Sequence, residues 1–425
     1  MHYPKMFRVR QHFEGPQLDD VAGAVASELA KLSLGRKVKP GQTVAISAGS
    51  RGIANIALVI KAIVEHFKGL GATPFIVPAM GSHGGGTAEG QRAILEGYGI
   101  TPEYTGAEVR ASMETIIVGT TPEGIPVHFD RNASQADHVV VCGRVKPHTG
   151  FAGDIESGLM KMMLIGLGKH RGATIYHRAI QNYSFGQIVR SVGQMVLKQC
   201  KVVAGVAVVE NCYDETALVE AVHPDEFEQR EKALLVKAKQ WMPRLPFNHV
   251  DLLIVDEMGK NISGSGMDTN VIGRKYHSHE AAEHEFPKVT RIFVRGLTRA
   301  THGNAAGIGV AEFCTTRLVE QTNWDYTYIN CLTGGSPEGA ACPLHYGTDR
   351  EVLEVALPSV GLVEPENARV VHIKNTLDLG EIGLSEAYLA EAQGRDDLTV
   401  VDPLREMAFD DEGNLQPVEL ALATR

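Results

Sequence analysis

"PGQTVAISAGSRGIANIALVIKAIVEHFKGLGATPFIV", residues 40–77, contains a strand–helix–strand unit that decides the fold class. Residues 44–47, with the sequence VAIS, follow a Pro-Gly turn and predict a buried strand. Apolar residues then recur at helical spacing from Ile53 to Phe67, and residues 75–77 predict the next strand. A strand, a helix and a second strand in this order predict an α/β fold with a parallel sheet.

The same alternation continues along the chain. Strands are predicted at 115–118, 138–142 and 202–209, and helices at 184–198 and 224–240. Two prolines in "QWMPRLPFNH", residues 240–249, break the pattern and predict a boundary between an N-terminal domain, 1–245, and a C-terminal Rossmann-like domain, 246–425. Later strands are predicted at 251–255, 291–294, 327–332, 370–373 and 398–400, with a Gly-rich turn-to-helix stretch at 303–313.

The expected architecture is therefore two α/β domains. Each has a parallel or mixed sheet with flanking helices, and a cofactor cleft lies between them. The C-terminal end of the chain is expected to pack back on the first domain.

The composition excludes several classes of function. The 425 residues are 44% hydrophobic and 22% charged, which is typical of a soluble globular protein. Because 41 Lys and Arg face 51 Asp and Glu, the net charge is −10, and a nucleic-acid partner is not expected. We see neither a signal peptide nor a membrane span, so we expect a cytoplasmic protein. The six cysteines form no CxxC pair and are expected to be reduced.

"GSHGGGTAEG", residues 81–90, places His83 before three glycines and a predicted helix start. Glycines let the backbone turn tightly and approach a ligand, and Thr87 is a good helix cap. The free N–H groups of a helix start favour an anion. We therefore expect His83 at the mouth of a pocket for a carboxylate or phosphate.

A second polar stretch, "GRVKPHTGFAGDIESGLMKMMLIGLGKHRGATIYH", spans residues 143–177. It begins where the strand 138–142 ends, and open α/β sheets bind ligands at the carboxyl ends of their strands. His148 follows a proline, and Lys161 lies in an apolar run, where a poorly solvated amine is a candidate nucleophile or covalent anchor. His177 comes sixteen residues after Lys161. Each residue also has a structural interpretation, since many histidines are structural and buried lysines often extend to water.

These motifs together resemble the nickel-dependent lactate racemase family. The resemblance is carried, in order, by "GSHGGGT", "KPHTGFAG" and "GKHRGATIYH", by the spacing from Lys161 to His177, and by "GMDTNVIGRK" at 266–275. It implies a racemase or epimerase that inverts C2 of a 2-hydroxy acid by hydride transfer to and from a nickel-pincer nucleotide. Cofactor maturation enzymes would be its partners, and a homo-oligomer is compatible with it.

The resemblance also implies a role for each residue. His83 and His148 would be the two acid–base catalysts, one for each face of the substrate. Lys161 would hold the cofactor covalently, and His177 would ligate the nickel. Arg51 and Lys275 would contact the cofactor.

Three positions depart from the family pattern. Ala48 stands where the family has Asp, Gly273 stands near a family Gln with Lys275 shifted by one, and the loop between His148 and Lys161 is longer. A longer 2-hydroxy acid or a sugar acid is therefore an alternative to lactate.

Two other classes of function stay open. A divalent-metal hydrolase would need His83, His148 and His177 to converge on one ion. A non-catalytic binding homologue would take up the ligand without inverting it. A nicotinamide dehydrogenase is disfavoured, because no strand is followed by a GxGxxG turn with the required spacing.

Overall fold

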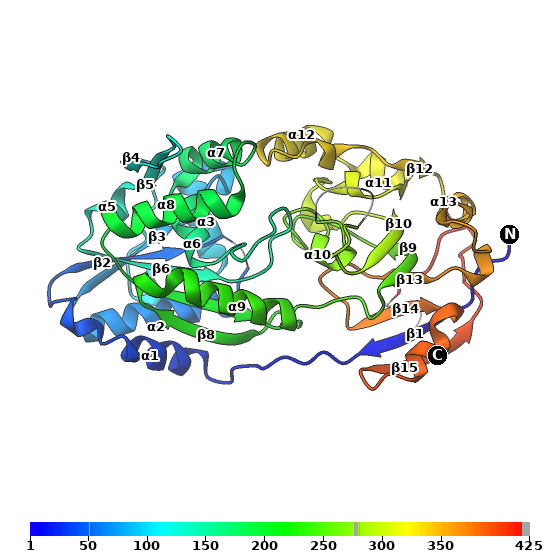
Figure 1. Cartoon of the computed structure of the whole chain (residues 1–425), viewed down its shortest axis with the longest axis horizontal. Coiled ribbons are helices and arrows are strands. Elements are labelled where there is room, and N and C mark those ends of the chain that lie inside the picture. Colours follow the sequence, from blue (N-terminus) through cyan, green and yellow to red (C-terminus); the bar gives the residue numbers. More distant parts are fainter. Residues whose placement is uncertain (51, 276–278, 280, 419–425) are drawn as a thin grey trace. The chain divides into compact units, whose positions relative to one another are not determined.

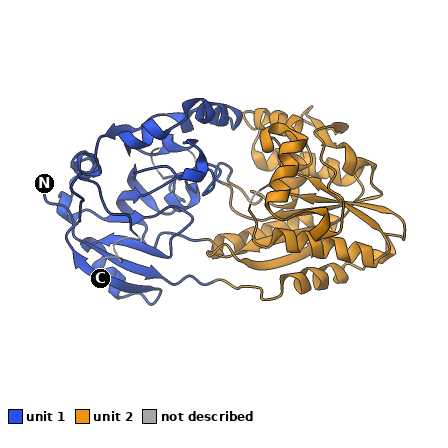
Figure 2. Cartoon of the chain, turned by 180° about the vertical axis from the view of Figure 1, so that it is seen from behind, with its two compact units in different colours: residues 1–14, 149–151, 243–425 blue, residues 15–148, 152–242 orange. Residues whose placement is uncertain are grey.

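The computed structural model describes residues 1–50, 52–275, 279 and 281–418, and it has a mixed α/β architecture (Figure 1). The chain forms two compact units (Figure 2). Unit 1 comprises residues 1–14, 149–151 and 243–425, and unit 2 comprises residues 15–148 and 152–242. The α/β fold class predicted from the sequence is confirmed.

The N-terminal strand explains why unit 1 is discontinuous. Strand β1 (Met6–Gln11) pairs antiparallel with both β14 (Glu381–Ser385) and β15 (Leu398–Arg405). Residues 1–14 therefore join the C-terminal part of the chain, which differs from the division 1–245 and 246–425 expected from the sequence. Short-range patterns could not reveal this pairing, because its partners lie at the opposite end of the chain.

Unit 2 is built on a five-stranded sheet in the order β3-β2-β6-β7-β8. Its strands are β2 (Thr43–Ala48), β3 (Thr73–Pro78), β6 (His138–Arg144), β7 (Val202–Glu210) and β8 (Thr216–Val222). The first four are parallel, and only β8 pairs antiparallel. Strand β3 lies on one side of β2, and β6 lies on the other. The order of strands therefore reverses between β2 and β6, and α/β sheets commonly bind ligands at such a switch point.

Helices cover the sheet of unit 2, and a hairpin forms a separate two-stranded sheet. The helices are α1 (Val21–Lys31), α2 (Ile56–Gly69), α3 (Ala88–Gly97), α4 (Pro102–Thr105), α5 (Arg131–Gln135), α6 (Leu159–Lys161), α7 (Lys169–Ala179), α8 (Phe185–Gln199) and α9 (Phe227–Trp241), and the hairpin is β4 (Thr115–Thr120) with β5 (Pro126–Asp130). Thr87 caps α3 as predicted, since its side chain accepts from Gly90 N–H. One core cluster joins buried side chains of α2, such as Ile60, to Ile46 of β2 and Val206 of β7.

Unit 1 contains an eight-stranded mixed sheet in the order β12-β11-β10-β9-β13-β14-β1-β15. Its remaining strands are β9 (His249–Val255), β10 (Lys288–Val294), β11 (Phe313–Thr315), β12 (Leu344–Tyr346) and β13 (Val370–Ile373). Its helices are α10 (Thr269–Ile272), α11 (Thr316–Gln321), α12 (Trp324–Thr333), α13 (Asp349–Ala356) and α14 (Leu389–Gln393). Strands β9 to β13 pair in parallel, which confirms an α/β core in this half.

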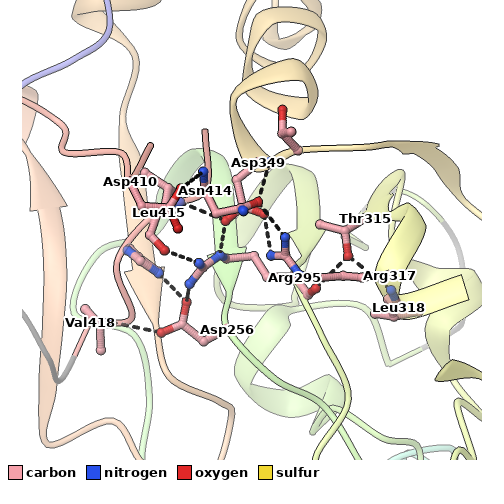
Figure 3. A network of polar contacts seen from close by, with 12 residues as sticks. Asp256, Arg295, Thr315, Arg317, Leu318, Asp349, Asp410, Asn414, Leu415 and Val418 are labelled. Atoms are coloured by element: carbon pink, nitrogen blue, oxygen red, sulfur yellow. Dashed lines mark hydrogen bonds and ion pairs between the residues drawn. The ribbon is translucent and has the colours of Figure 1, made fainter. Parts of the chain in front are cut away.

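A buried network of ion pairs holds the last described residues against the sheet of unit 1 (Figure 3). Arg295, which follows β10, pairs with Asp256 after β9 and with Asp349 at the start of α13. The backbone N–H groups of Leu415 and Val418 donate to these two carboxylates, each at 2.9 Å. Leu415 and Val418 therefore pack within unit 1. Residues 419–425 lie outside the described part of the chain, so the expectation that the end of the chain packs on the first domain stays a prediction.

Two predicted elements of unit 1 were wrong. Residues 327–332 form part of helix α12 rather than a strand, because Asn323 caps the helix and Thr327 and Cys331 are buried one turn apart. The stretch 303–313 forms a 3₁₀ turn, Ile308–Val310, and then enters β11 instead of a longer helix. Both segments are short, and short apolar runs do not separate helix from strand by periodicity.

Candidate functional site at the carboxyl edge of unit 2

The candidate site lies where the parallel strands of unit 2 end. His83 follows β3 and His148 follows β6, so the two histidines come from strands on either side of β2. Parallel strands end at one edge of a sheet, and the loops that carry the two histidines therefore leave the same edge. Arg51 follows β2, but this residue lies outside the described part of the chain.

The turn that carries Lys161 packs over this same edge. Met162, the next residue, opens a π-helical turn, Met162–Gly166. An ideal Cβ at Gly49, after β2, would lie 3.4 Å from Met162 Cε, and one at Gly143 of β6 would lie 2.6 Å from Met162 Cγ. Gly143 thus permits a close approach that a larger residue would block. These contacts place the Lys161 turn at the switch point, where the order of strands reverses between β2 and β6.

The His83 loop is held by neighbouring polar groups. The Nδ1 atom of His83 is hydrogen-bonded to Ser50 Oγ in the loop after β2, and Tyr98 donates its hydroxyl to the Ser50 carbonyl at 2.5 Å. Gln91, which is fully buried, donates to the carbonyl oxygens of Gly81 (2.9 Å) and His83 (3.2 Å). The ring and the backbone of His83 are both fixed from within unit 2.

The three glycines after His83 all have the left-handed backbone that favours glycine. Their φ angles are 65°, 66° and 65° at Gly84, Gly85 and Gly86. An ideal Cβ at Gly84 would lie 2.5 Å from the backbone of Gly90, so this loop folds tightly against the start of α3. The sequence argument for a tight glycine turn is confirmed.

His148 is held by a buried carboxylate and an aromatic ring. Its backbone N–H donates to Glu156 Oε2 at 2.9 Å, and Lys239 of α9 donates to Glu156 Oε1 at 2.7 Å. The imidazole stacks on Phe185 at the start of α8, with ring centroids 6.4 Å apart and an interplanar angle of 21°. The longer loop after His148 is therefore ordered by contacts with α8 and α9.

Lys161 and His177 lie close enough to influence each other electrostatically. Burial lowers the pKa of His177, and the positive charge of Lys161 lowers it further. Both side chains are half-buried. A histidine with a lowered pKa is neutral near pH 7, and the neutral imidazole is the form that binds a metal ion.

Helix α7, which carries His177, runs beside the His83 loop. An ideal Cβ at Gly81 would lie 3.5 Å from Ala173 Cβ, and one at Gly86 would lie 3.8 Å from the His170 ring. His170 and Arg171 are exposed, which agrees with their omission from the candidate residues. The structure thus brings the segments of His83, Lys161 and His177 to one edge.

Sequence reasoning missed the buried ion pair that anchors α7. Lys169 Nζ lies 2.7 Å from Asp130 Oδ2, and both side chains are fully buried. Lys169 also donates to the Pro78 carbonyl at the end of β3, at 2.5 Å. No local pattern links these residues, because they lie far apart in the sequence. Ser50 was missed for the same reason. Glu156 lies only eight residues from His148, but the loop between them has no repeating spacing that would link the two.

Lys275 belongs to unit 1, so its part in the site stays a prediction. It is buried, and its backbone N–H donates to Glu285 at 2.6 Å. Gly273, two residues earlier, has a φ of 70°, and an ideal Cβ there would lie 1.8 Å from the Pro287 carbonyl oxygen. The backbone therefore requires glycine at 273, which explains why a glutamine cannot stand there.

The three histidines of the hydrolase alternative do not form a metal-binding group. Among the described residues, which include His83, His148 and His177, no cluster of three or more His, Cys, Asp or Glu side chains could hold a metal ion. That alternative required all three rings to converge on one ion and so finds no support.

Among the described residues, no helix is long and apolar enough to cross a membrane.

The fold defines an α/β protein whose candidate site lies in the loops that follow the parallel strands of unit 2. Residues 14–186 match the family model described as the lactate racemase N-terminal domain, and this segment contains His83, His148, Lys161 and His177. This part of the chain belongs to the lactate racemase family. The resemblance stated from the sequence is thereby confirmed at the level of the family.

Two solved structures are similar to this chain. A protein from Thermotoga maritima is 12% identical, with a TM-score of 0.52, and the match covers 83% of this chain and 94% of that one. At this identity the likeness concerns the fold alone. The lactate racemase apoprotein from Thermoanaerobacterium thermosaccharolyticum is 14% identical over 91% of this chain and 92% of that one, with a TM-score of 0.47. No curated protein sequence matches this chain.

Proposed function

We propose that this protein is a racemase or epimerase that inverts the C2 stereocentre of a 2-hydroxy acid. The observation that carries the proposal is the closeness of Lys161 and His177 within the segment that matches the lactate racemase N-terminal domain. Family membership favours an isomerase of the racemase type. The substrate, the cofactor and the residue roles below belong to the proposal.

The residues of this edge fit a nickel-pincer nucleotide. Lys161 offers an amine for a covalent bond, and His177 offers a neutral imidazole nitrogen, which suits nickel. The glycine turn after His83 leaves the backbone bare, so that a ligand can approach it closely. When bound, the cofactor supplies the group that accepts and returns the hydrogen at C2 of the substrate.

The two histidines move the proton of the C2 hydroxyl group. One takes this proton from the first enantiomer, and the other returns a proton to the oxygen as the second enantiomer forms. Because Nδ1 of His83 is hydrogen-bonded to Ser50, we assign the exchange of the substrate proton to its Nε2 atom. Phe185 and the backbone bond to Glu156 hold His148 for the same task on the opposite face.

The substrate we propose is larger than lactate. Ala48, where the family has Asp, is fully buried at the end of β2 and presents no polar group. This change and the longer loop after His148 favour a longer 2-hydroxy acid or a sugar acid. Cofactor maturation enzymes are the partners that the proposal requires.

The experiment is to measure intact mass and nickel content after co-production with pincer-nucleotide maturation enzymes. Wild type is compared with Lys161→Arg, which keeps the charge, and with Lys198→Arg, an exposed control on α8. We expect added mass and about one nickel per chain in wild type and in the control, but not in Lys161→Arg. No added mass in wild type, when a known family member loads normally, would refute the proposal.

Loaded protein is then incubated with single enantiomers of lactate, longer 2-hydroxy acids and sugar acids, and the products are separated by chiral chromatography. Inversion of one of these acids is expected, with loss of inversion in His83→Asn and His148→Asn. A loaded wild type that inverts none of them would instead identify a non-catalytic binding homologue.

A further inference from the structure

Glu231 is a buried carboxyl group to which the proposed function gives no role. It lies in the middle of α9, which packs against α6 and β7, and its exposed fraction is 1%. Burial raises its pKa to about 8. Burial of a carboxyl group away from water lowers the stability of the fold, and ionisable groups with such shifted pKa values are concentrated at functional sites.

The carboxyl group of Glu231 contacts the start of the helix that carries Lys161. The backbone N–H of Met160 donates to Glu231 Oε2 at 2.9 Å, and the N–H of Leu159 is a second donor that lowers the pKa of this carboxyl. The first N–H groups of any helix have no acceptor within it. Glu231 supplies that acceptor, and Lys161 is the very next residue after Met160.

Gly158 makes this contact possible. Its φ is 96°, and an ideal Cβ there would lie 2.7 Å from Glu231 Cδ and 2.8 Å from Oε2. A side chain at 158 would therefore displace the carboxyl group. The other oxygen, Oε1, has no hydrogen-bond partner among the residues that the structure describes. The contacts of the carboxyl group described here are therefore with the turn of residues 158–161.

Building on the role proposed for Lys161, we propose that Glu231 is a positioning residue for that lysine. Its carboxyl group fixes the first turn of α6, and through this turn it fixes the backbone from which the Lys161 amine is presented. Glu231 does not touch the substrate in this proposal.

The same helix also holds the His148 loop. Lys239, two turns after Glu231, pairs with Glu156, which accepts from the backbone N–H of His148. Helix α9 therefore fixes the loops of both a proposed catalytic histidine and the proposed anchor lysine. This explains why α9 contributes to the site although it lies outside residues 14–186.

The test begins with hydrogen exchange of the full chain produced without maturation enzymes. Wild type is compared with Glu231→Gln, which keeps an acceptor oxygen, with Glu231→Leu, and with Glu228→Gln as a control one turn away. We expect the Met160 amide to be protected in wild type and to exchange at least about tenfold faster in Glu231→Leu. Glu231→Gln and the control should stay near wild type.

Two results would overturn the proposal at this stage. One is a Met160 amide in wild type that exchanges as fast as an exposed amide, a measurement that needs no variant to fold. The other is a folded Glu231→Leu with unchanged exchange at Met160.

A second readout separates positioning from a merely structural role. The rate at which an amine-reactive acylating reagent labels Lys161 is measured by peptide mass spectrometry, relative to the exposed Lys198. We expect this ratio to change at least about threefold in Glu231→Leu and to return toward wild type in Glu231→Gln. An unchanged ratio overturns the positioning role. A changed ratio in a protein that never takes up cofactor mass supports Glu231 and refutes only the proposed function.

Discussion

The buried pair of Lys169 and Asp130 offers a sharp test of how α7 is anchored. We consider Lys169→Met, which keeps the length of the side chain and removes its charge. At 2.7 Å and an effective dielectric constant near 20, the attraction between the two charges is about 6 kcal/mol. The loss of water around two fully buried ions offsets most of this attraction.

The single change should therefore be far more costly than the removal of both charges. Lys169→Met leaves the Asp130 carboxylate buried without its cation, which typically costs about 3–5 kcal/mol. It also removes the hydrogen bond that Lys169 donates to the Pro78 carbonyl. In the double variant Lys169→Met with Asp130→Asn, the side chain at 130 can still cap α5, since Asn is a good cap. We expect a loss of only about 1–3 kcal/mol there, from the carbonyl.

The assay is urea unfolding followed by circular dichroism for wild type, both single variants and the double variant. The four free energies of unfolding give the coupling between residues 130 and 169. A double variant that is as unstable as Lys169→Met would refute the reasoning, because the cost would then come from packing and not from an uncompensated charge.

Three further predictions concern other positions. Gly143→Ala should reduce cofactor loading, because its Cβ would lie 2.6 Å from Met162 Cγ, and Met162→Ala in the same chain should restore loading; intact mass measures both. Gly273→Gln should lower the free energy of unfolding by several kcal/mol, since its φ is 70° and its Cβ would lie 1.8 Å from the Pro287 oxygen; urea unfolding measures this, with Gly97→Ala, in open space on α3, as the control. The raised pKa of Glu231 should make wild type lose stability relative to Glu231→Gln as pH rises from about 4.5 to about 8.

The sign of the pH effect follows from proton binding. The folded state holds a proton on Glu231 up to about pH 8, whereas the unfolded chain releases it near the ordinary value of 4.5. The stabilisation is therefore complete below the lower value and is lost as pH rises through the upper one, by about 1.4 kcal/mol for each unit of difference. Parallel stability curves for the two proteins across this range would contradict the prediction.

Local patterns predicted the parts of the fold that local residues determine. Strand β2 and helix α2 were found because apolar spacing reports burial directly, and Thr87 was found because a cap acts within one turn. The strand expected at 327–332 failed because its few apolar residues suit either period. The pairing of β1 with β14 and β15 could not be seen, since nothing near residue 6 reports on residue 385.

The candidate site divides in the same way. Glycine turns and the Lys161–His177 spacing drew attention to the segments that the structure brings to one edge, although the roles of these residues stay predictions. The residues that hold those segments could not be predicted, because Glu231 and Lys169 contact partners on distant elements of the chain. An ionisable residue that is buried in a helix, such as Glu231, cannot be told from an exposed one by its residue type alone.

The insertion of unit 2 into unit 1 has a consequence for synthesis on the ribosome. Every strand of the unit 2 sheet has been made by residue 222, so this unit can fold while much of unit 1 is still untranslated. Strand β1 is made before the other described strands, yet its two partners in the sheet are the last two of them to be made. During that interval β1 is an unpaired edge that invites wrong pairing. Unit 2, which carries the proposed catalytic histidines, can therefore fold early in synthesis, whereas β1 can pair with β14 and β15 only near its end.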